Sequence, residues 1–231
     1  MMDTKIIVAT HKEYNMPEEE YYLPVFVGSA LNELDLPYQR DDEGDNISNK
    51  NRSFCELTGL YWAYKNLKAD YIGLSHYRRR LNLSGVDLSK YDVILPGKRH
   101  YYIETVYSQF KHAHGSEGLD KAREIIKKDH PEYLESFDRC MQKRSLHIFN
   151  IFVMKYDIFR SYCDFLFDLL FKIEEELGDV DRLYGYISER LLDVFLDHNK
   201  IAYKEVPLIE TEPVNWIKKI YAFLKRKFKN R

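Results

Sequence analysis

The stretch that decides the fold reads DYIGLSHYRRRL and spans residues 70–81. Its first half is short, apolar and bounded by polar residues, which is typical of a buried β-strand. The strand is followed at once by His76 and, after one tyrosine, by three arginines. Three arginines in a row can form a solvated turn, but polar groups directly after a buried strand lie at a sheet edge, where sites form. We therefore favour a site role for His76 and at least one arginine, with Arg80 as the structural member.

Short apolar runs and helical spacing extend this pattern along the chain. Further strands are predicted over residues 5–9, 91–95, 147–154 and 203–207. Helices are predicted over residues 54–67, 117–128, 131–142, 156–177, 182–197 and 213–228, and loops over 13–28 and 40–53. Strands that alternate with helices predict an α/β sheet with mostly parallel strands.

Polar clusters follow three of the predicted strands, and they begin at Thr10, His76 and Pro96. Because the carboxyl ends of parallel strands meet at one edge of a sheet, we expect Thr10, His76 and Lys98 to line one cleft. Most of the clustered side chains are basic, so the cleft would be positive. Such a cleft suits a phosphate or a diphosphate, whose oxygens arginine can bind in pairs.

The composition describes one globular domain with a basic tail. The chain has 231 residues and a formal net charge of −2, so we expect no nucleic-acid partner. Three widely spaced cysteines, Cys55, Cys140 and Cys163, argue against a disulfide framework or a zinc cluster and fit the cytoplasm. We expect neither a signal peptide nor a membrane span. The domain is predicted over 1–212, followed by a basic amphipathic helix over 213–231.

Several common motifs are missing from the sequence. It holds no P-loop, no Rossmann glycine fingerprint, no HExxH and no GxSxG. Two metal signals are weak, because His112 and His114 also fit a polar loop, and Asp41, Asp42 and Asp45 equally fit a solvated turn. Nineteen tyrosines suit a protein that handles sugars, although a biased composition explains them equally well.

The order of several segments resembles a family of bacterial capsular and exopolysaccharide glycosyltransferases. This family has long been catalogued as a domain of unknown function and is related to galactofuranosyltransferase domains of O-antigen synthesis. The resembling segments are KIIVATHK (5–12), YQRDDEGDNISNKNRSFCELTGLYWAYKN (38–66), DYIGLSHYRRRL (70–81), DVILPGK (92–98), FNIFVMK (149–155) and GYISERLLDVFL (185–196). The resemblance implies a GT-A-like fold, in which a nucleotide-binding sheet is flanked by helices.

The resemblance also implies a donor site. Its expected members are Thr10, His11, Lys12, Asp45, Asn46, Ile47, Tyr77, Arg78, Arg79 and Lys98. The residues His-Tyr-Arg-Arg stand where ordinary GT-A enzymes keep an Asp-x-Asp that holds a divalent ion. Cationic side chains would then neutralise the leaving diphosphate in place of the metal. We predict no metal ligands, and Mn²⁺ or Mg²⁺ is an alternative that the sequence does not favour.

An inverting transferase needs a carboxylate that takes the proton of the acceptor hydroxyl. Glu189 is the first candidate, assisted by His76, and Glu117 and Asp120 stand behind it. The alternative is that Glu189 only pairs with Arg190 or Arg182 on a helix surface. Glu56 is expected to organise the donor loop. The acceptor is expected to contact His112, His114, Glu117 and Arg190.

The expected function is transfer of a hexose, such as galactofuranose, from a nucleotide-sugar, in the first place a UDP-sugar. The acceptor implied by the resemblance is a lipid-linked glycan of capsule, exopolysaccharide or O-antigen synthesis. An inactive subunit that binds nucleotide-sugar or glycan on the same fold is the alternative. A phosphate hydrolase that uses the basic rim is a third and weaker reading.

The tail after Glu212 has no acidic residue and carries an apolar helical face that includes Trp216. Basic amphipathic helices bind anionic membrane surfaces. We therefore expect a peripheral protein at the inner face of the cell membrane. The alternative is a terminal helix that packs its apolar face against the domain.

Overall fold

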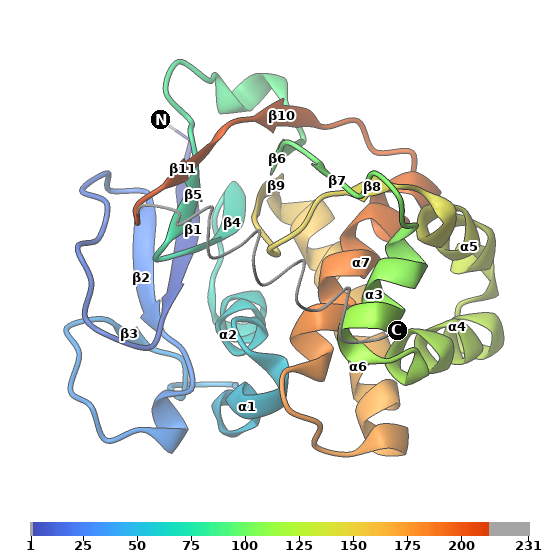
Figure 1. Ribbon diagram of the computed structural model, residues 1–231. Helices are drawn as coiled ribbons and strands as arrows, with labels where there is room; N and C mark the ends of the chain where they lie inside the picture. The colour runs from blue at the N-terminus through green and yellow to red at the C-terminus, as the bar shows by residue number, and fades with distance from the viewer. Residues whose placement is uncertain (1, 213–231) are drawn as a thin grey trace.

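The computed structural model describes residues 2–212, and its centre is one mixed β-sheet (Figure 1). The strand order in the described chain is β10-β6-β9-β4-β1-β2-β3, and β5 and β11 extend it beside β4. The strands are β1 (Thr4–Thr10), β2 (Tyr22–Phe26), β3 (Gln39–Arg40), β4 (Tyr71–His76), β5 (Arg79–Leu81), β6 (Val93–Pro96), β9 (Phe152–Lys155), β10 (Lys204–Val206) and β11 (Leu208–Glu210). A separate pair joins β7 (Arg99–His100) to β8 (Ser145–Leu146).

Strand direction decides which loops meet at one edge. β1 runs parallel to both β2 and β4, and β6 runs parallel to β10. β9 is antiparallel to both of its neighbours, β4 and β6. Ala9 stands opposite His76 in the register of β1 and β4, so Thr10 and His76 lie at the same edge of the sheet. This part of the predicted site arrangement is confirmed.

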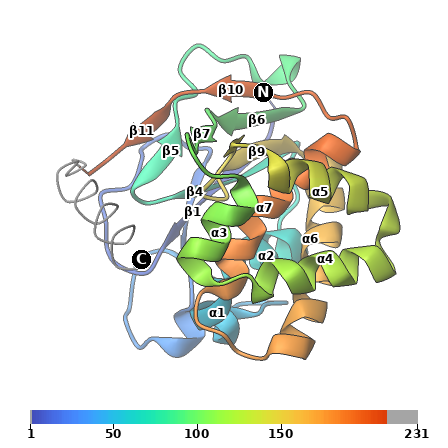
Figure 2. The ribbon, with the colours of Figure 1, turned by 45° about the vertical axis from the view of Figure 1, so that its right-hand side comes forward.

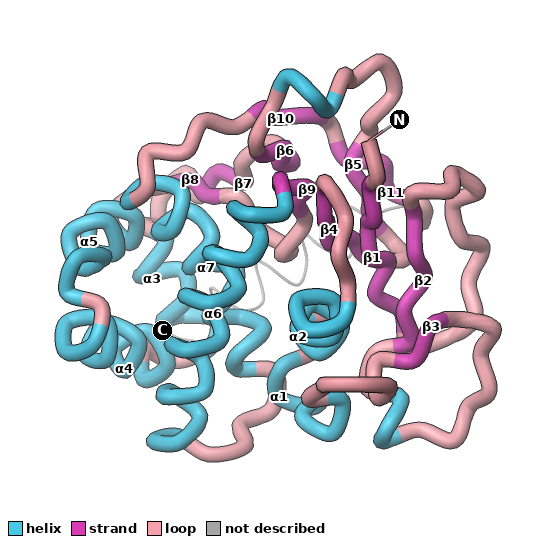
Figure 3. The backbone as a smooth tube through the Cα atoms, turned by 180° about the vertical axis from the view of Figure 1, so that it is seen from behind, coloured by secondary structure: helices cyan, strands magenta, loops and turns pink. Residues whose placement is uncertain are grey.

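The helices lie to one side of the sheet in two layers, as Figures 1 and 3 show. They are α1 (Asn51–Phe54), α2 (Leu57–Asn66), α3 (Val106–His114), α4 (Glu117–Asp129), α5 (Leu134–Gln142), α6 (Tyr156–Leu177) and α7 (Leu183–His198). α2 and α6 pack directly on the strands, and α4 and α7 pack on α6. The larger hydrophobic core fills this side, and a smaller cluster beneath β4 and β6 is covered by loop side chains such as Tyr14 and Leu83. The architecture is the predicted α/β sheet flanked by helices. The prediction of mostly parallel strands was wrong, because the described main sheet has four parallel and four antiparallel strand pairs.

The predicted elements differ from the structure at several places. β2 lies inside the loop predicted over 13–28 and pairs with β1. It was missed because Pro24 stands within it, and proline is uncommon inside strands. The helix predicted over 54–67 is broken at Cys55, whose φ is 54°. The strand predicted over 147–154 is interrupted by Phe149 and Asn150, which have φ values of 76° and 51°. α3 was not predicted, and the helix predicted over 213–228 lies outside the described residues.

The interior of the sheet leaves no room for a side chain at Gly73. A β-carbon there would lie 2.6 Å from the backbone oxygen of Phe152 and 2.9 Å from Cγ2 of Val153. We expect Gly73→Ala to lower the free energy of unfolding by about 1–3 kcal/mol, because the neighbouring strand must shift. Urea denaturation measures the change. Gly97→Ala is the control, since its β-carbon would meet open space, and an equal loss in both variants would contradict the crowding at Gly73.

Candidate active site

His76 ends β4 beside two carboxylates. Its Nε2 lies 2.6 Å from the carbonyl oxygen of Phe149, so this nitrogen carries the hydrogen, because a carbonyl only accepts. The same nitrogen is 3.9 Å from Oε1 of Glu56. The charge of His76 also acts on Glu189, where it lowers the pKa of the carboxyl group. Residues 56, 76 and 189 therefore meet at the carboxyl edge of the sheet.

Unusual backbone brings Glu56 into this group. Cys55, whose φ is positive at 54°, separates α1 from α2 and leaves Glu56 at the start of α2. The buried side chain of Asn150 donates through Nδ2 to Oε1 of Glu56 at 2.6 Å and to Oγ of Ser188 at 2.9 Å. A positive φ at a residue other than glycine costs roughly 1–2 kcal/mol, and such residues gather at functional sites. Here they bring together three segments that are far apart in the sequence.

Glu189 sits deep in α7, yet its side chain is still 19% exposed and so can reach solvent. Burial raises the pKa of its carboxyl group above the usual glutamate value, and the neighbouring charge of Glu56 raises it further. Arg190, His76 and a hydrogen bond from the Phe149 backbone lower the pKa without cancelling that rise. The result is a carboxylate that holds a proton more readily than an exposed glutamate.

Arg190 is the partner of Glu189 rather than a group on the protein surface. Its Nη1 lies 2.6 Å from Oε2 of Glu189, and its Nη2 donates to Oε1 of Gln109 at 2.9 Å. The residue is only 3% exposed, and its guanidinium lies over the ring of Phe110. The prediction that Arg190 contacts an acceptor directly does not fit this burial. The pairing alternative was correct about the partner and wrong in placing the pair on a helix surface.

Unpartnered polar atoms gather at the same place. Within the described residues, the buried side-chain atoms that lack a hydrogen-bond partner are Arg79 Nε, Asn150 Oδ1 and Arg190 Nε. Arg79 lies over the ring of Phe149, at 4.3 Å from its centroid, while Arg190 is bound to Glu189. Buried polar atoms are costly unless a water or a ligand completes their bonding. Asn150 binds Glu56, Arg190 binds Glu189, and Arg79 lies over Phe149, the residue before Asn150. The three unpartnered atoms therefore belong to side chains around these two carboxylates.

A cationic rim surrounds the ring of Tyr77, next to His76. The ring of His11 meets it edge-on at 5.4 Å, and the charged groups of Lys12 and Arg78 lie 5.0 and 5.1 Å from its centroid. Thr10 builds the turn that carries this rim, since its buried Oγ1 donates to the carbonyl of Lys12 at 2.7 Å. The structure therefore brings together the first three predicted donor residues, Tyr77 and Arg78.

Arg182 links this rim to Glu56, since its charge acts on His11 and the charge of Glu56 acts on it. It precedes α7 with a φ of 59°, and its guanidinium lies over the ring of Tyr186. The pKa of His11 is lowered chiefly by burial and then by the charges of Lys12, Arg78 and Arg182. In the sequence Arg182 stood only as a surface partner of Glu189. Because α7 starts only at Leu183, the spacing of seven residues to Glu189 gave no reliable signal of where Arg182 lies.

The loop with Asp45, Asn46 and Ile47 is held by contacts of its own, and none of these contacts joins it to the cationic rim in the described chain. Asn66 holds it, accepting from the backbone N–H of Asp45 and donating to its carbonyl at 2.8 Å. Asn66 ends α2 while Glu56 precedes it, and ten helical residues span about 15 Å. The side chain of Ile47 is buried in the core. The described chain thus shows no contact between these three residues and His11, and their role in donor binding stays a prediction.

Lys98 also lies apart from Thr10 and His76. Its ammonium donates to the hydroxyl of Tyr203 at 2.8 Å, and it lines a hollow of about 270 Å³ with Asp193 and Asp197. β6 and β4 are both antiparallel to β9 and therefore run parallel to each other, so the loop after β6 lies at the same edge of the sheet as His76, as predicted. Because β9 is inserted between them, that loop starts two strand spacings, or about 10 Å, from His76, and in the described chain Lys98 lines this hollow and not the rim around Tyr77.

Arg79, a predicted donor residue, already has an acidic neighbour, because its Nε lies 3.7 Å from Oε1 of Glu210.

The predicted acceptor residues on α3 and α4 lie at the protein surface. His112 is exposed and hydrogen-bonds Glu104, and Glu117 is exposed in the first turn of α4. His114 stacks on Tyr186 at 3.9 Å, which places it beside Arg182.

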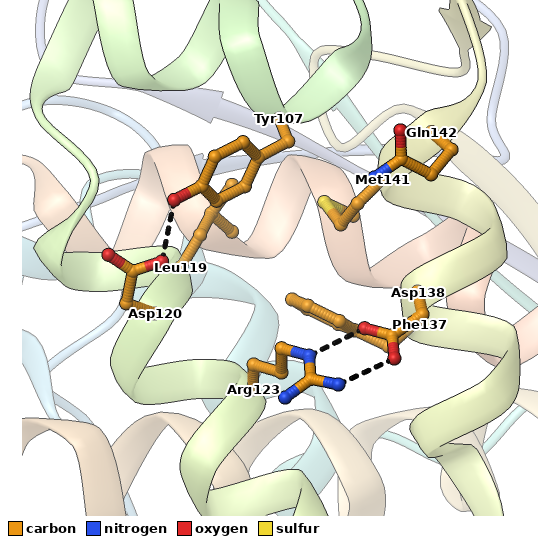
Figure 4. A pocket seen from close by; sticks show the side chains of 8 residues that line it. All are labelled: Tyr107, Leu119, Asp120, Arg123, Phe137, Asp138, Met141 and Gln142. Carbon is orange, nitrogen blue, oxygen red and sulfur yellow. Dashed lines mark hydrogen bonds and ion pairs between the residues drawn. The ribbon is translucent and has the colours of Figure 1, made fainter.

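Asp120, the reserve carboxylate, belongs to a different hollow. It accepts a hydrogen bond from Tyr107 at 2.7 Å in an open pocket of about 430 Å³ between α3, α4 and α5, as Figure 4 shows. The pocket is otherwise lined by Arg123, Asp138 and apolar side chains such as Phe137. None of the groups around Glu189 lines it, so Asp120 is poorly placed to replace Glu189.

Two of the aspartates considered as cation ligands, Asp41 and Asp42, bind neighbouring residues in the structure. The buried carboxylate of Asp41 accepts hydrogen bonds from Gly28 and Ser29 and from the hydroxyl of Ser48. Asp42 pairs with Arg40, which holds the pKa of its carboxyl below the usual value. Between residues 2 and 212, no three His, Cys, Asp or Glu side chains form a group suited to a metal ion.

Comparison with known proteins gives two matches. The model of a family described as "Domain of unknown function (DUF4422)" matches residues 5–200. A solved apo structure of the WbbM bifunctional glycosyltransferase superposes with a TM-score of 0.84 and 26% sequence identity over 91% of this chain. The chain spans 46% of the length of that structure. No curated protein matches significantly.

Proposed function

The chain belongs to the DUF4422 family, and from that premise we propose that it is a glycosyltransferase that uses a nucleotide-sugar donor. The fold it shares with a bifunctional glycosyltransferase supports the class of reaction. The observation that carries the proposal is Glu189, a deep carboxylate with a raised pKa on which the charge of His76 acts; His76 directly precedes Tyr77, the centre of the cationic rim. In this proposal Glu189 takes the proton of the acceptor, and the basic side chains of the rim bind the leaving diphosphate.

The proposed reaction proceeds by inversion. The acceptor hydroxyl oxygen forms a bond to the anomeric carbon, and its proton passes to the Glu189 carboxylate. The bond between that carbon and the donor phosphate oxygen breaks, and the electron pair leaves with the nucleoside diphosphate. Lys12, Arg78 and Arg182 would stabilise the charge on the diphosphate. Arg190 holds the carboxylate of Glu189 in position.

Glu56, His76 and Asn150 have supporting roles in this proposal. The negative charge of Glu56 raises the pKa of Glu189 and so strengthens it as a base. Asn150 fixes Glu56 at 2.6 Å, and His76 is itself fixed by the Phe149 carbonyl. His76 therefore orients the site instead of moving a proton.

The donor end of the site is tested by Arg78→Ala. We expect donor binding to weaken by about 1.5–3 kcal/mol, the range for hydrogen bonds to charged groups. Isothermal titration with the donor measures this loss. Arg80→Ala is the matched control, because Arg80 follows in the same arginine run but lies over Tyr22, toward the second core cluster. Equal losses, or activity that EDTA abolishes and Mn²⁺ restores while Arg78→Ala has no effect, would assign the diphosphate to a different cation.

The proposed function itself is tested by release of nucleoside diphosphate. UDP-, GDP- and dTDP-sugars and CMP-sugars are first screened by thermal shift, because a ligand of the folded state stabilises it in proportion to the logarithm of its concentration over Kd. A donor that stabilises the protein and is turned over in the presence of glycan supports the transferase. Binding without turnover on any glycan would favour an inactive binding subunit.

The proposed setting is synthesis of a bacterial surface polysaccharide on a lipid-linked acceptor at the inner face of the cell membrane. The support for this setting is the resemblance of the sequence to capsular and exopolysaccharide transferases. Residues 2–212 include no helix that is long and apolar enough to cross a bilayer. The basic helix predicted over 213–231 lies outside the described residues.

A further inference from the structure

The loop between β7 and α3 exposes two adjacent apolar residues. Tyr102 is 86% exposed and Ile103 is 64% exposed, the highest values among the large hydrophobic side chains of the described chain. Single exposed apolar residues are ordinary, but two neighbours at the tip of one loop form a small contact surface. The question is what this surface meets.

The loop is held firmly in shape. The backbone N–H of Tyr101 donates to the carbonyl of Arg144 at 2.7 Å, and that of Val106 donates to Lys143 at 2.8 Å. Thr105 closes a capping box at the start of α3. Both ends of the loop are therefore hydrogen-bonded to the same neighbouring segment. The loop is already ordered, so binding through its apolar tip would cost little conformational entropy.

The surroundings of the tip are basic. Arg99 and His100 precede it in β7, and Arg144 lies beside it, with Nη1 3.5 Å from the carbonyl of Tyr102; all three are exposed. The nearest acid in the loop, Glu104, is already paired with His112 at 2.7 Å. An aromatic and an aliphatic side chain ringed by arginines is the pattern of a segment that lies in the headgroup region of a bilayer.

A second exposed apolar pair shows that charge, and not apolarity alone, sets this loop apart. Leu31, in the short 3₁₀ helix Ser29–Leu31, is 58% exposed, and Leu34 is 48% exposed. Their neighbours Glu33 and Asp35 are acidic and exposed. An anionic surface would repel that pair and attract the Tyr102 loop.

We propose that Tyr102 and Ile103, with Arg99 and Arg144, dock the protein on an anionic lipid surface. The adjoining Tyr101 is buried next to Arg190 and Glu189, whose charges act on it. Figure 2 shows β7 and α3 beside α7, which carries Glu189. Docking would therefore hold the site close to the headgroups. This last consequence rests on the proposed function, whereas the lipid contact does not.

The test uses the full-length chain and vesicles of phosphatidylcholine alone or with about 30% phosphatidylglycerol, which supplies the negative surface potential. We expect Tyr102→Ser/Ile103→Ser to lower the partition coefficient into anionic vesicles at least tenfold. Leu31→Ser/Leu34→Ser, the matched control, should lower it less than twofold. Arg99→Gln/Arg144→Gln should lower it by roughly fivefold for each arginine and weaken its dependence on salt.

Three results would overturn the docking surface. They are equal partition of the loop variant and the wild type, equal binding of the wild type to neutral and anionic vesicles, and loss of transfer to a water-soluble glycan in the loop variant with vesicle binding intact. The last would make the loop a glycan contact. Unchanged melting temperatures show that the variants are folded. Vesicle binding is measured without turnover, so failure of the transferase proposal would leave this result standing.

Discussion

Glu189→Gln is expected to lower turnover by about 10²–10⁴-fold while donor binding stays within a factor of two or so of the wild type. Glutamine keeps the shape of the side chain but cannot take the proton of the acceptor hydroxyl. Nucleoside diphosphate release measures turnover, and titration calorimetry measures donor affinity. Near-normal turnover would return Glu189 to the role of a structural partner of Arg190.

The pH profile gives a second measurement of the same residue. A general base must be deprotonated, and burial raises the pKa of Glu189, so the acid limb of the profile should lie above the pH of an ordinary glutamate. Glu56→Gln is the matched control. It removes the negative charge that raises the pKa of Glu189, so its acid limb should move to lower pH, with a smaller loss of turnover than Glu189→Gln causes.

Arg190→Ala is expected to lower the free energy of unfolding by about 3–5 kcal/mol, the typical cost of removing one partner from a buried ion pair. The guanidinium is 3% exposed, and its loss leaves the Glu189 carboxylate deep in the protein without its cation. It also removes the hydrogen bond to Gln109 and the packing on Phe110. Denaturation in urea, followed by circular dichroism, measures the change.

An exposed pair of the same chemistry provides the control. Arg123 binds Asp138 through two hydrogen bonds of 2.7 Å, a geometry as good as that of the buried pair, yet both side chains are nearly half exposed. Arg123→Ala should therefore cost only about 0–1 kcal/mol. Equal losses in the two variants would show that burial does not set the strength of the Arg190 pair.

The long amphipathic helices could be predicted from the sequence, and the tight connections could not. α4, α6 and α7 begin and end close to their predicted limits, because many apolar residues at helical spacing agree with one another. The break at Cys55 and the left-handed pair at Phe149 and Asn150 each depend on one or two residues. Of these, only asparagine is commonly found in that conformation.

The contrast between regular elements and tight connections also decided how much of the candidate site could be predicted. His76, Glu189 and residues 10–12 were predicted as members of the candidate site because they follow a strand or lie in a strongly patterned helix, and their functional roles stay predictions. The approach of Glu56 to His76 was missed, because it follows from the broken helix at Cys55. Lys98 lies at the predicted edge but about 10 Å from His76, because the sequence did not show that β9 is inserted between β6 and β4. Among these predictions of position, those that depend on local sequence pattern agreed with the structure, and those that depend on a contact between distant segments did not.

The sequence distance between the parts of the site has a consequence for how the protein acquires activity. Asn150 is 94 positions from Glu56, and Phe149 is 73 positions from His76, so the loop-closure entropy of these contacts is high. Contacts of this range form late relative to helices, whose own bonds are local. A nascent chain that has not yet released α7 from the ribosome lacks Glu189, the proposed base. Under the proposed function, activity would therefore appear only after α7 has joined the segments that hold Glu56 and His76 in place.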